Sequence, residues 1–370
     1  MRVQITNGMF MAIIINLVYA KAIGLTQGSM AREIGSDMWI ATALSTFQGA
    51  LFMLLTVLII RRLPQSDLIE QSAVLGGKWF SKVISLLLFV FFIGAFGAVM
   101  TTFVYHLKDY FLPDAPILLF IIVPFLIGVY GIMFGLEVIG RMAVIGILSI
   151  LALNILLLLG SLSNFDIREL LPVFRSGVGE TLWASRHNNT DWAMATMMAA
   201  LILPNVKNPK TWGKSGVAGI GYGGAFVLMW PILEAGVLSA EVTGNYIISC
   251  MQMARSAEIG LFIHRYEMIM IAFFALSSIT QILMTLLCAS ISFQRLFNLK
   301  DYRPVIIPVG IILCAYSYWL VFDHHRAIMI MENQWVLVAS VISIFVPGFV
   351  WTLGIIRKKK LLHKRFEEGL

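Results

Sequence analysis

The feature that most constrains this chain is a series of ten apolar runs, each long enough to cross a membrane as a helix. About 20 residues at roughly 1.5 Å per residue span about 30 Å of hydrocarbon. Only 13% of the residues are charged and 59% are hydrophobic, whereas about a quarter of a soluble domain is charged. We therefore predict an all-α integral membrane protein, with residues 1–370 forming a single membrane domain. The ten predicted spans are 8–33, 38–60, 80–107, 116–135, 142–161, 184–205, 215–238, 266–293, 304–322 and 334–356.

The distribution of Lys and Arg between the connecting loops predicts the orientation of these spans. With the N-terminus inside, eighteen of these basic residues fall on the cytoplasmic side and eight on the opposite side. Six of the eighteen lie in a basic tail, residues 357–370, which would hold the last helix against anionic membrane lipid. Both termini are therefore expected to be cytoplasmic. The net charge of +7 requires no nucleic acid as a partner.

The first span carries polar residues at a depth where a lipid-facing helix would not. Lys21 lies about ten residues from either end, and an intramembrane lysine costs a few kcal/mol or more unless it faces protein or water. The small residues Ala20, Ala22 and Gly24, next to Tyr19, would permit a break whose freed amides and carbonyls could bind a ligand. The alternative is that Lys21 snorkels to an interface or pairs with a buried acid.

The layout divides into two halves of five spans each, and an odd number of spans forces the second half to insert upside down. The halves are residues 8–161 and 184–356. In each half the first span is the interrupted one, which is the pattern of a binding site at the middle of the membrane. In the sixth span, the polar stretch His187–Asp191 would place Asn188, Asn189 and Asp191 beside the first break. The alternative is that this stretch is an outer loop and that the membrane begins at Trp192.

Other polar residues inside the spans are candidates for ion or proton coupling. Ser277 and Ser278 could coordinate a cation together with carbonyls of a broken first span, or could bond back to their own helix. The Lys21 ammonium could instead occupy the position of such a cation. Glu234 could be the partner of Lys21 or part of a proton relay. Gly97 in the third span is expected to allow close packing at the ligand site.

No feature of the sequence predicts an enzyme, a cofactor or a metal centre. The three cysteines, Cys250, Cys288 and Cys314, are scattered, so free thiols are expected. The adjacent pair His324 and His325 lacks a metal-ligand spacing. The glycine-rich run that begins at Gly219 lies inside an apolar span with no strand before it, so it is not a phosphate-binding loop.

A short segment after the first span resembles a known family. It reads Lys21-Ala-Ile-Gly-Leu and then Met30-Ala-Arg-Glu-Ile-Gly-Ser-Asp-Met-Trp-Ile, with the pattern A-x-E-x-G-x-D-x-W. This pattern, together with the ten-span layout, Pro64 after the second span, the entry His-Arg-Tyr-Glu267 to the eighth span and the basic tail, resembles the B subunits of nutrient germinant receptors. These subunits form the spore germination permease family of the amino acid–polyamine–organocation superfamily.

The resemblance implies a leucine-transporter-like fold of five-plus-five inverted helices with broken helices 1 and 6. It also implies a complex with an A subunit and a C lipoprotein in the inner membrane of the spore, where the receptor senses amino acids or similar nutrients. The family often has a glycine-rich break in the first span, where this chain has Ala20, Lys21 and Ala22. From the fold that the resemblance implies, we expect a small nutrient to bind between spans 1, 3, 6 and 8. The alternative function is a proton-coupled amino acid transporter.

Overall fold

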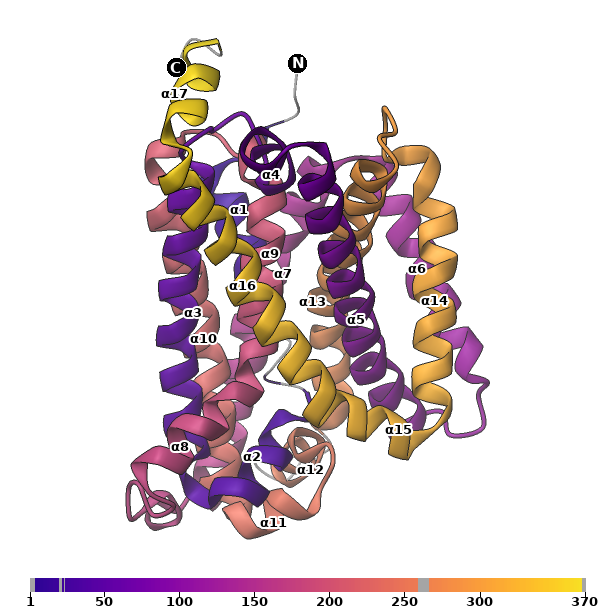
Figure 1. The fold of residues 1–370 in the computed structure, drawn as a ribbon. Helices are drawn as coiled ribbons and strands as arrows, with labels where there is room; N and C mark the ends of the chain where they lie inside the picture. The colour runs from indigo at the N-terminus through magenta and orange to yellow at the C-terminus, as the bar shows by residue number, and fades with distance from the viewer. Residues whose placement is uncertain (1–3, 20–21, 23, 259–265, 368–370) are drawn as a thin grey trace.

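A computed structural model describes residues 4–19, 22, 24–258 and 266–367. The regular structure of these residues is helical, apart from an isolated parallel bridge between Ile5 and Val206. The longer helices are α1 (Asn7–Tyr19), α3 (Met38–Ile60), α5 (Lys78–Tyr110), α6 (Ile117–Met133), α7 (Leu136–Ser161), α9 (Asn189–Ile202), α10 (Trp212–Leu238), α13 (Tyr266–Leu296), α14 (Ile306–Phe322) and α16 (Trp335–Ile356). Most of them run roughly side by side (Figure 1).

Every predicted span coincides with helical structure, and seven helical segments are long and apolar enough by themselves to cross a membrane. The helices α1 and α6 are shorter apolar helices, and α9 has 14 residues. The all-α membrane architecture is therefore confirmed, while the count of ten spans stays a prediction. The division into inverted halves at 8–161 and 184–356 also stays a prediction.

The first predicted span is interrupted, as expected. The helix α1 ends at Tyr19, and a separate helix, α2 (Thr26–Ile34), begins seven residues later. The interruption in the sixth span takes a different form from the expected unwound stretch. A short helix, α8 (Val178–Ala184), passes through a single 3-10 turn, Ser185–Asn188, directly into α9.

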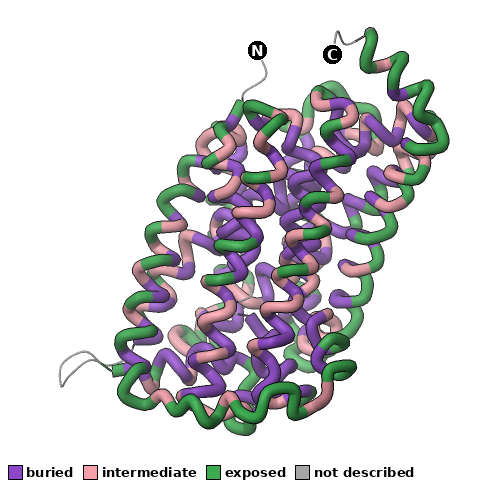
Figure 2. Tube along the Cα trace, turned by 90° about the vertical axis from the view of Figure 1, so that its left-hand side faces the viewer, coloured by how far each residue is buried: buried purple, intermediate pink, exposed green. Residues whose placement is uncertain are grey.

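The helix α1 lies in the interior, which explains why it is apolar on all sides. It packs against α7, α10 and α13, and Ile13 and Ile14 are fully buried. Glycines on α10 allow this approach, because a Cβ at Gly219 would lie 2.7 Å from Ile14 Cβ, and one at Gly223 would lie 3.0 Å from Val18 Cβ. Figure 2 shows the buried segments gathered inside the bundle and the exposed ones along its outside. Many of the exposed positions on α6, α7 and α16 are large apolar residues, as expected for a surface that faces lipid.

Short helices cover the two ends of the bundle (Figure 1). At one end lie α2, α8, α11 (Ala240–Asn245) and α12 (Ser249–Ser256). At the other end lie α4 (Leu68–Gly76) and α17 (Lys358–Glu367), and the described N-terminal residues begin at this same end. A fifth short helix near the first end, α15 (His324–Met329), leads through a π-helical turn, Ile330–Gln334, into α16.

Candidate functional site

The end of α1 is tied to α13 through a backbone carbonyl. The carbonyl oxygen of Asn16 accepts a hydrogen bond from Gln281 Nε2 at 2.8 Å and another from Ser277 Oγ at 3.1 Å. The Asn16 side chain in turn donates from Nδ2 to the carbonyl of Ala143 on α7 at 2.8 Å. These buried bonds fix the last turn of α1 between two long helices, immediately before the interruption.

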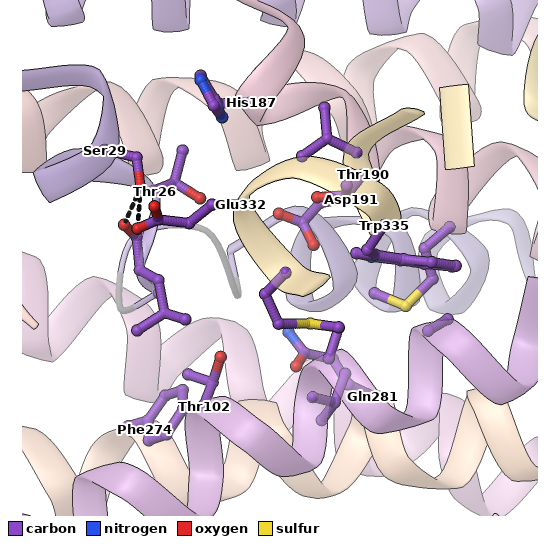
Figure 3. Close-up of a pocket in the computed structure, with 18 residues that line it drawn as sticks. Thr26, Ser29, Thr102, His187, Thr190, Asp191, Phe274, Gln281, Glu332 and Trp335 are labelled. Atoms are coloured by element: carbon purple, nitrogen blue, oxygen red, sulfur yellow. Dashed lines mark hydrogen bonds between the residues drawn. The ribbon is translucent and has the colours of Figure 1, made fainter. Parts of the chain in front are cut away.

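A cavity of about 70 Å³ opens beyond this point. A cavity that holds a single water molecule has a volume of about 10–15 Å³. The space therefore suits a molecule of roughly five or six non-hydrogen atoms. Its walls come from Gly24 and Leu25 before α2, from α2 itself, from α5, from the start of α9, from α13 and from the π turn that leads into α16. Figure 3 shows the labelled side chains of these elements gathered around the Asp191 carboxylate. The cavity therefore lies between the predicted spans 1, 3, 6 and 8, and the last span adds a wall that the sequence did not predict.

The polar groups of the cavity favour a positively charged ligand group. Asp191 and Glu332 each supply a carboxyl group, and His187, Thr190 and Gln281 supply further polar atoms. Among the described residues that line the cavity, none is Lys or Arg. Because Glu332 is paired with Arg32 at 2.6 Å, the preference for a cation depends mainly on Asp191, in surroundings where charges interact more strongly than in bulk water.

Two ion-pair clusters lie at the edge of the cavity, where the short helices cover the bundle. Glu332 Oε1 accepts from Arg32 Nη2 and from Ser29 Oγ, both at 2.6 Å, which joins α2 to the turn before α16. Glu33 holds Arg186 in a bidentate pair at 2.7 and 3.1 Å and contacts His187 Nε2 at 2.8 Å. The helix α2 is thus fastened on two sides, to the last span and to the 3-10 turn before α9.

The motif A-x-E-x-G-x-D-x-W has a physical explanation in these contacts. Its acidic residue, Glu33, forms the second cluster. Its glycine, Gly35, ends α2 with a positive φ of 58°, a conformation that L side chains rarely adopt. The Asp37 side chain is fully buried and accepts from the Ser176 amide at 2.9 Å and from Ser176 Oγ at 2.7 Å. The motif therefore positions α2 at the edge of the cavity.

Several predicted ligand-binding residues have clear positions in the structure. Gly24 and Asp191 line the cavity. Ala22, two residues before Gly24, is fully buried. Tyr19 does not line it, because its hydroxyl donates to Asn154 Oδ1 at 3.1 Å and accepts from Trp230 Nε1 at 3.3 Å. Ala20 and Lys21 lie outside the described residues, so the predictions made for them are not tested.

The remaining predicted ligand-binding residues lie at the periphery of the cavity. The side chain of Asn188 donates to Thr42 Oγ1 at 3.2 Å, and Asn188 lines a smaller neighbouring cavity of about 20 Å³ together with Asp191. Asn189 accepts from the indole of Trp192 at 3.0 Å. Gly97 faces α14, since a Cβ there would lie 2.5 Å from the Tyr316 ring. Close packing at Gly97 is therefore confirmed, but this residue is not among those that line the cavity.

The described candidates for ion or proton coupling lie on α13 and α10. Ser277 bonds to α1 and not to its own helix, and Ser278 is fully buried with no hydrogen-bond partner for its hydroxyl within the described residues. Glu234 on α10 is fully buried, and its Oε2 accepts from Ser249 Oγ of α12 at 2.5 Å. It does not line the cavity of Asp191, so its coupling role stays a prediction.

Glu332, Arg32 and Trp335 were missed in the sequence as residues of the site. Glu332 and Trp335 lie at the start of the last predicted span, a position that is typical of an ordinary interfacial helix end. The sequence shows only that α5 has a glycine, Gly94, at a position where a side chain is missing. In the structure the Trp335 ring packs directly against this glycine. Only the tertiary contact reveals that pairing.

Comparison with known proteins places this geometry in a family. The family described as spore germination protein matches residues 4–321 of the chain. Spore germination protein YndE of Bacillus subtilis is 26% identical over 317 residues, covering 84% of this chain and 86% of that protein. Spore germination protein KB of the same organism is 22% identical, covering 100% of this chain and 98% of that protein.

Solved transporter structures share the fold. Mhp1, a nucleobase-cation-symport-1 family transporter, superposes with a TM-score of 0.70 at 12% identity, covering 92% of this chain and 78% of that one. MhsT in complex with L-phenylalanine gives a TM-score of 0.60 at 15% identity, covering 95% of this chain and 96% of that one. At such identities the likeness establishes the fold alone. The chain belongs to the spore germination protein family and has the leucine-transporter-like fold of an integral membrane permease.

Proposed function

We propose that this protein is a nutrient-sensing membrane subunit of a spore germination receptor, and that it binds a small molecule with an ammonium group, such as a small amino acid. The observation that carries the proposal is the acidic cavity of about 70 Å³ at the interruption after α1. Its size suits about five or six non-hydrogen atoms. The carboxyl group of Asp191 favours an ammonium group, while Glu332 at the edge is paired with Arg32.

The two ion-pair clusters support a sensing mechanism. The pairs Arg32–Glu332 and Glu33–Arg186 join α2 to two other elements at the edge of the cavity. Release of these pairs would let α2 move and open the cavity. A ligand that binds better to the closed arrangement would shift the population toward it, and a hundredfold shift needs about 2.7 kcal/mol of preference.

The family and its relatives support a place in a receptor complex. We infer that the partners are an A subunit and a C lipoprotein, that the complex lies in the inner membrane of the spore, and that both termini are cytoplasmic. The described ends of the chain lie at the same end of the bundle, which agrees with two termini on one side (Figure 1).

A binding experiment on the purified protein tests the ligand class. L-alanine carries an ammonium and a carboxylate group, its methyl ester carries only the ammonium group, and lactate carries only the carboxylate group. We expect the alanine compounds to bind and lactate not to bind, and we expect Asp191→Asn to weaken binding at least tenfold. The matched control is Glu137→Gln, which removes an exposed carboxylate of α7 that pairs with Arg141 away from the cavity. Binding of lactate in preference to alanine would contradict the proposal.

The buried carboxyl group of Glu234 supports a second candidate function, that of a proton-coupled amino acid transporter. An intramembrane acid that is fully buried and bonded to Ser249 is the kind of group that proton-coupled carriers use. Uptake of labelled amino acid into vesicles by this chain alone, driven by a proton gradient and lost in Glu234→Gln, would favour transport. A nutrient-dependent germination response without uptake would favour sensing.

A further inference from the structure

A basic pocket lies at the junction of α16 and α17, far from the acidic cavity. It has a volume of about 370 Å³, and three cations line it: Arg62 after α3, and Lys358 and Arg365 on α17. Among the described residues, no carboxylate lines this pocket. Lys358 and Arg365 are exposed and form no ion pair with any described residue. Among the residues that the structure describes, the positive charge of this pocket is therefore not compensated by an acid.

The sequence of α17 directs this charge to one side of the helix. Lys358, Leu361, Leu362 and Arg365 follow the spacing i, i+3, i+4 and i+7, which is one face of an α-helix. All four line the pocket. Leu361 is buried, whereas Leu362 remains 53% exposed, so the same face offers both cations and an open apolar wall.

The third cation is held in place by a glycine and a tryptophan of α16. The Arg62 guanidinium lies over the Trp351 ring, 3.8 Å from its centroid, and donates to the Trp351 carbonyl at 3.2 Å. A methyl group at Gly354 would overlap Arg62 Nη1, so only glycine allows this approach. These two contacts with Trp351 hold Arg62 at the wall of the pocket.

The position of the pocket decides which anion it suits. The helix α16 is a membrane-spanning segment that ends at Ile356, and α17 begins two residues later. Ile355, which lines the pocket, is 59% exposed on the lipid-facing surface. A free phosphate ion would gain nothing from the exposed apolar walls, whereas a phospholipid places its phosphate and its acyl chains at this boundary. Arginine matches phosphate in a bidentate geometry.

We propose that this pocket binds one anionic phospholipid, with the headgroup phosphate between Arg62, Lys358 and Arg365 and an acyl chain along Ile355. The purified full chain in detergent is titrated with short-chain phosphatidylglycerol, with short-chain phosphatidylcholine and with inorganic phosphate. Bound lipid is counted by native mass spectrometry. We expect one phosphatidylglycerol to bind tightly and neither of the other two probes to bind at the same concentration.

A matched pair of double variants distinguishes binding in a specific pocket from general attraction of lipid to a basic tail. Lys358→Gln/Arg365→Gln removes two charges inside the pocket, and Lys359→Gln/Lys360→Gln removes two exposed charges of the same helix that do not line it. At about 1 kcal/mol per cation, the first variant should weaken phosphatidylglycerol binding roughly 30-fold. The second should change it less than threefold.

Three results would overturn the proposal. Equal weakening in both double variants would mean that the tail attracts anionic lipid without a specific site. Binding of inorganic phosphate as tight as that of phosphatidylglycerol would mean a simple phosphate site. Tighter binding of an acidic peptide, such as a short polyglutamate, would mean that the pocket receives an acidic segment of a protein. Circular dichroism and gel filtration of each variant confirm that it remains folded.

Discussion

Replacing Glu33 by Gln should open the cavity, because this one carboxylate holds two partners across its edge. Glu33 forms the bidentate pair with Arg186 and the contact with His187. The substitution keeps the shape of the side chain and removes its charge. Arg186 would keep its bond to the Trp183 carbonyl at 3.0 Å and its position over the Trp183 ring, so the 3-10 turn should stay intact while α2 is released.

The size of the effect follows from the exposure of the pair. Hydrogen bonds to charged groups contribute about 1.5–3 kcal/mol when buried, and exposed ion pairs contribute about 0.2–1 kcal/mol. The side chains of Glu33 and Arg186 are 27% and 23% exposed, which places the pair between these limits, at about 1–2 kcal/mol. An equilibrium between closed and open cavities would then shift roughly 5- to 30-fold toward the open form.

Thiol labelling of a cavity residue measures this shift. Thr102 lines the cavity, so Thr102→Cys in a Cys314→Ser background reports its accessibility, while the two other native cysteines are buried. We expect Glu33→Gln to raise the rate of labelling by an impermeant reagent 5- to 30-fold. Glu137→Gln, which breaks an exposed pair on α7, should leave the rate within twofold. An unchanged rate in Glu33→Gln, or an equal rise in the control, would refute the idea that this cluster closes the cavity.

Two further predictions concern packing and charge elsewhere in the bundle. Gly224→Ala should lower the free energy of unfolding by about 1–3 kcal/mol, because the new methyl would overlap Thr46 Cγ2 between α10 and α3. Thr46→Ala should recover part of that loss in detergent unfolding, and a wild-type stability of the single variant would contradict this. Burial and the nearby Glu70 raise the pKa of Asp67 to about 6, and Arg295 offsets only part of this. The folded protein therefore holds the proton more tightly than the unfolded chain, so the free energy of unfolding should fall as the pH rises from about 4 to 6. Asp67→Asn keeps the N-cap acceptor of α4 and should remove this slope, and identical slopes in both proteins would show that Asp67 is not its source.

Part of the candidate site could be predicted because membrane depth makes polar residues conspicuous. The polar residues after Tyr19 indicated an interrupted first span, and Asp191 was predicted as part of the polar stretch that interrupts the sixth. Tyr19 itself was assigned to the ligand for the same reason, but its hydroxyl is satisfied by Asn154 and Trp230. Local sequence cannot separate a polar group that faces a ligand from one that faces another helix, since both avoid lipid.

The sequence by itself determined the class of fold, the approximate place of each long helix and the interruption of the first span. These properties depend on local quantities, namely the length of an apolar run and the cost of a polar group inside it. The tertiary structure alone decided which surfaces meet. It brought Glu332 from the last span to Arg32, and it brought Arg62 to the basic face of α17. Both are contacts between residues about 300 positions apart, which no local pattern specifies, and at Arg62 the close approach requires Gly354.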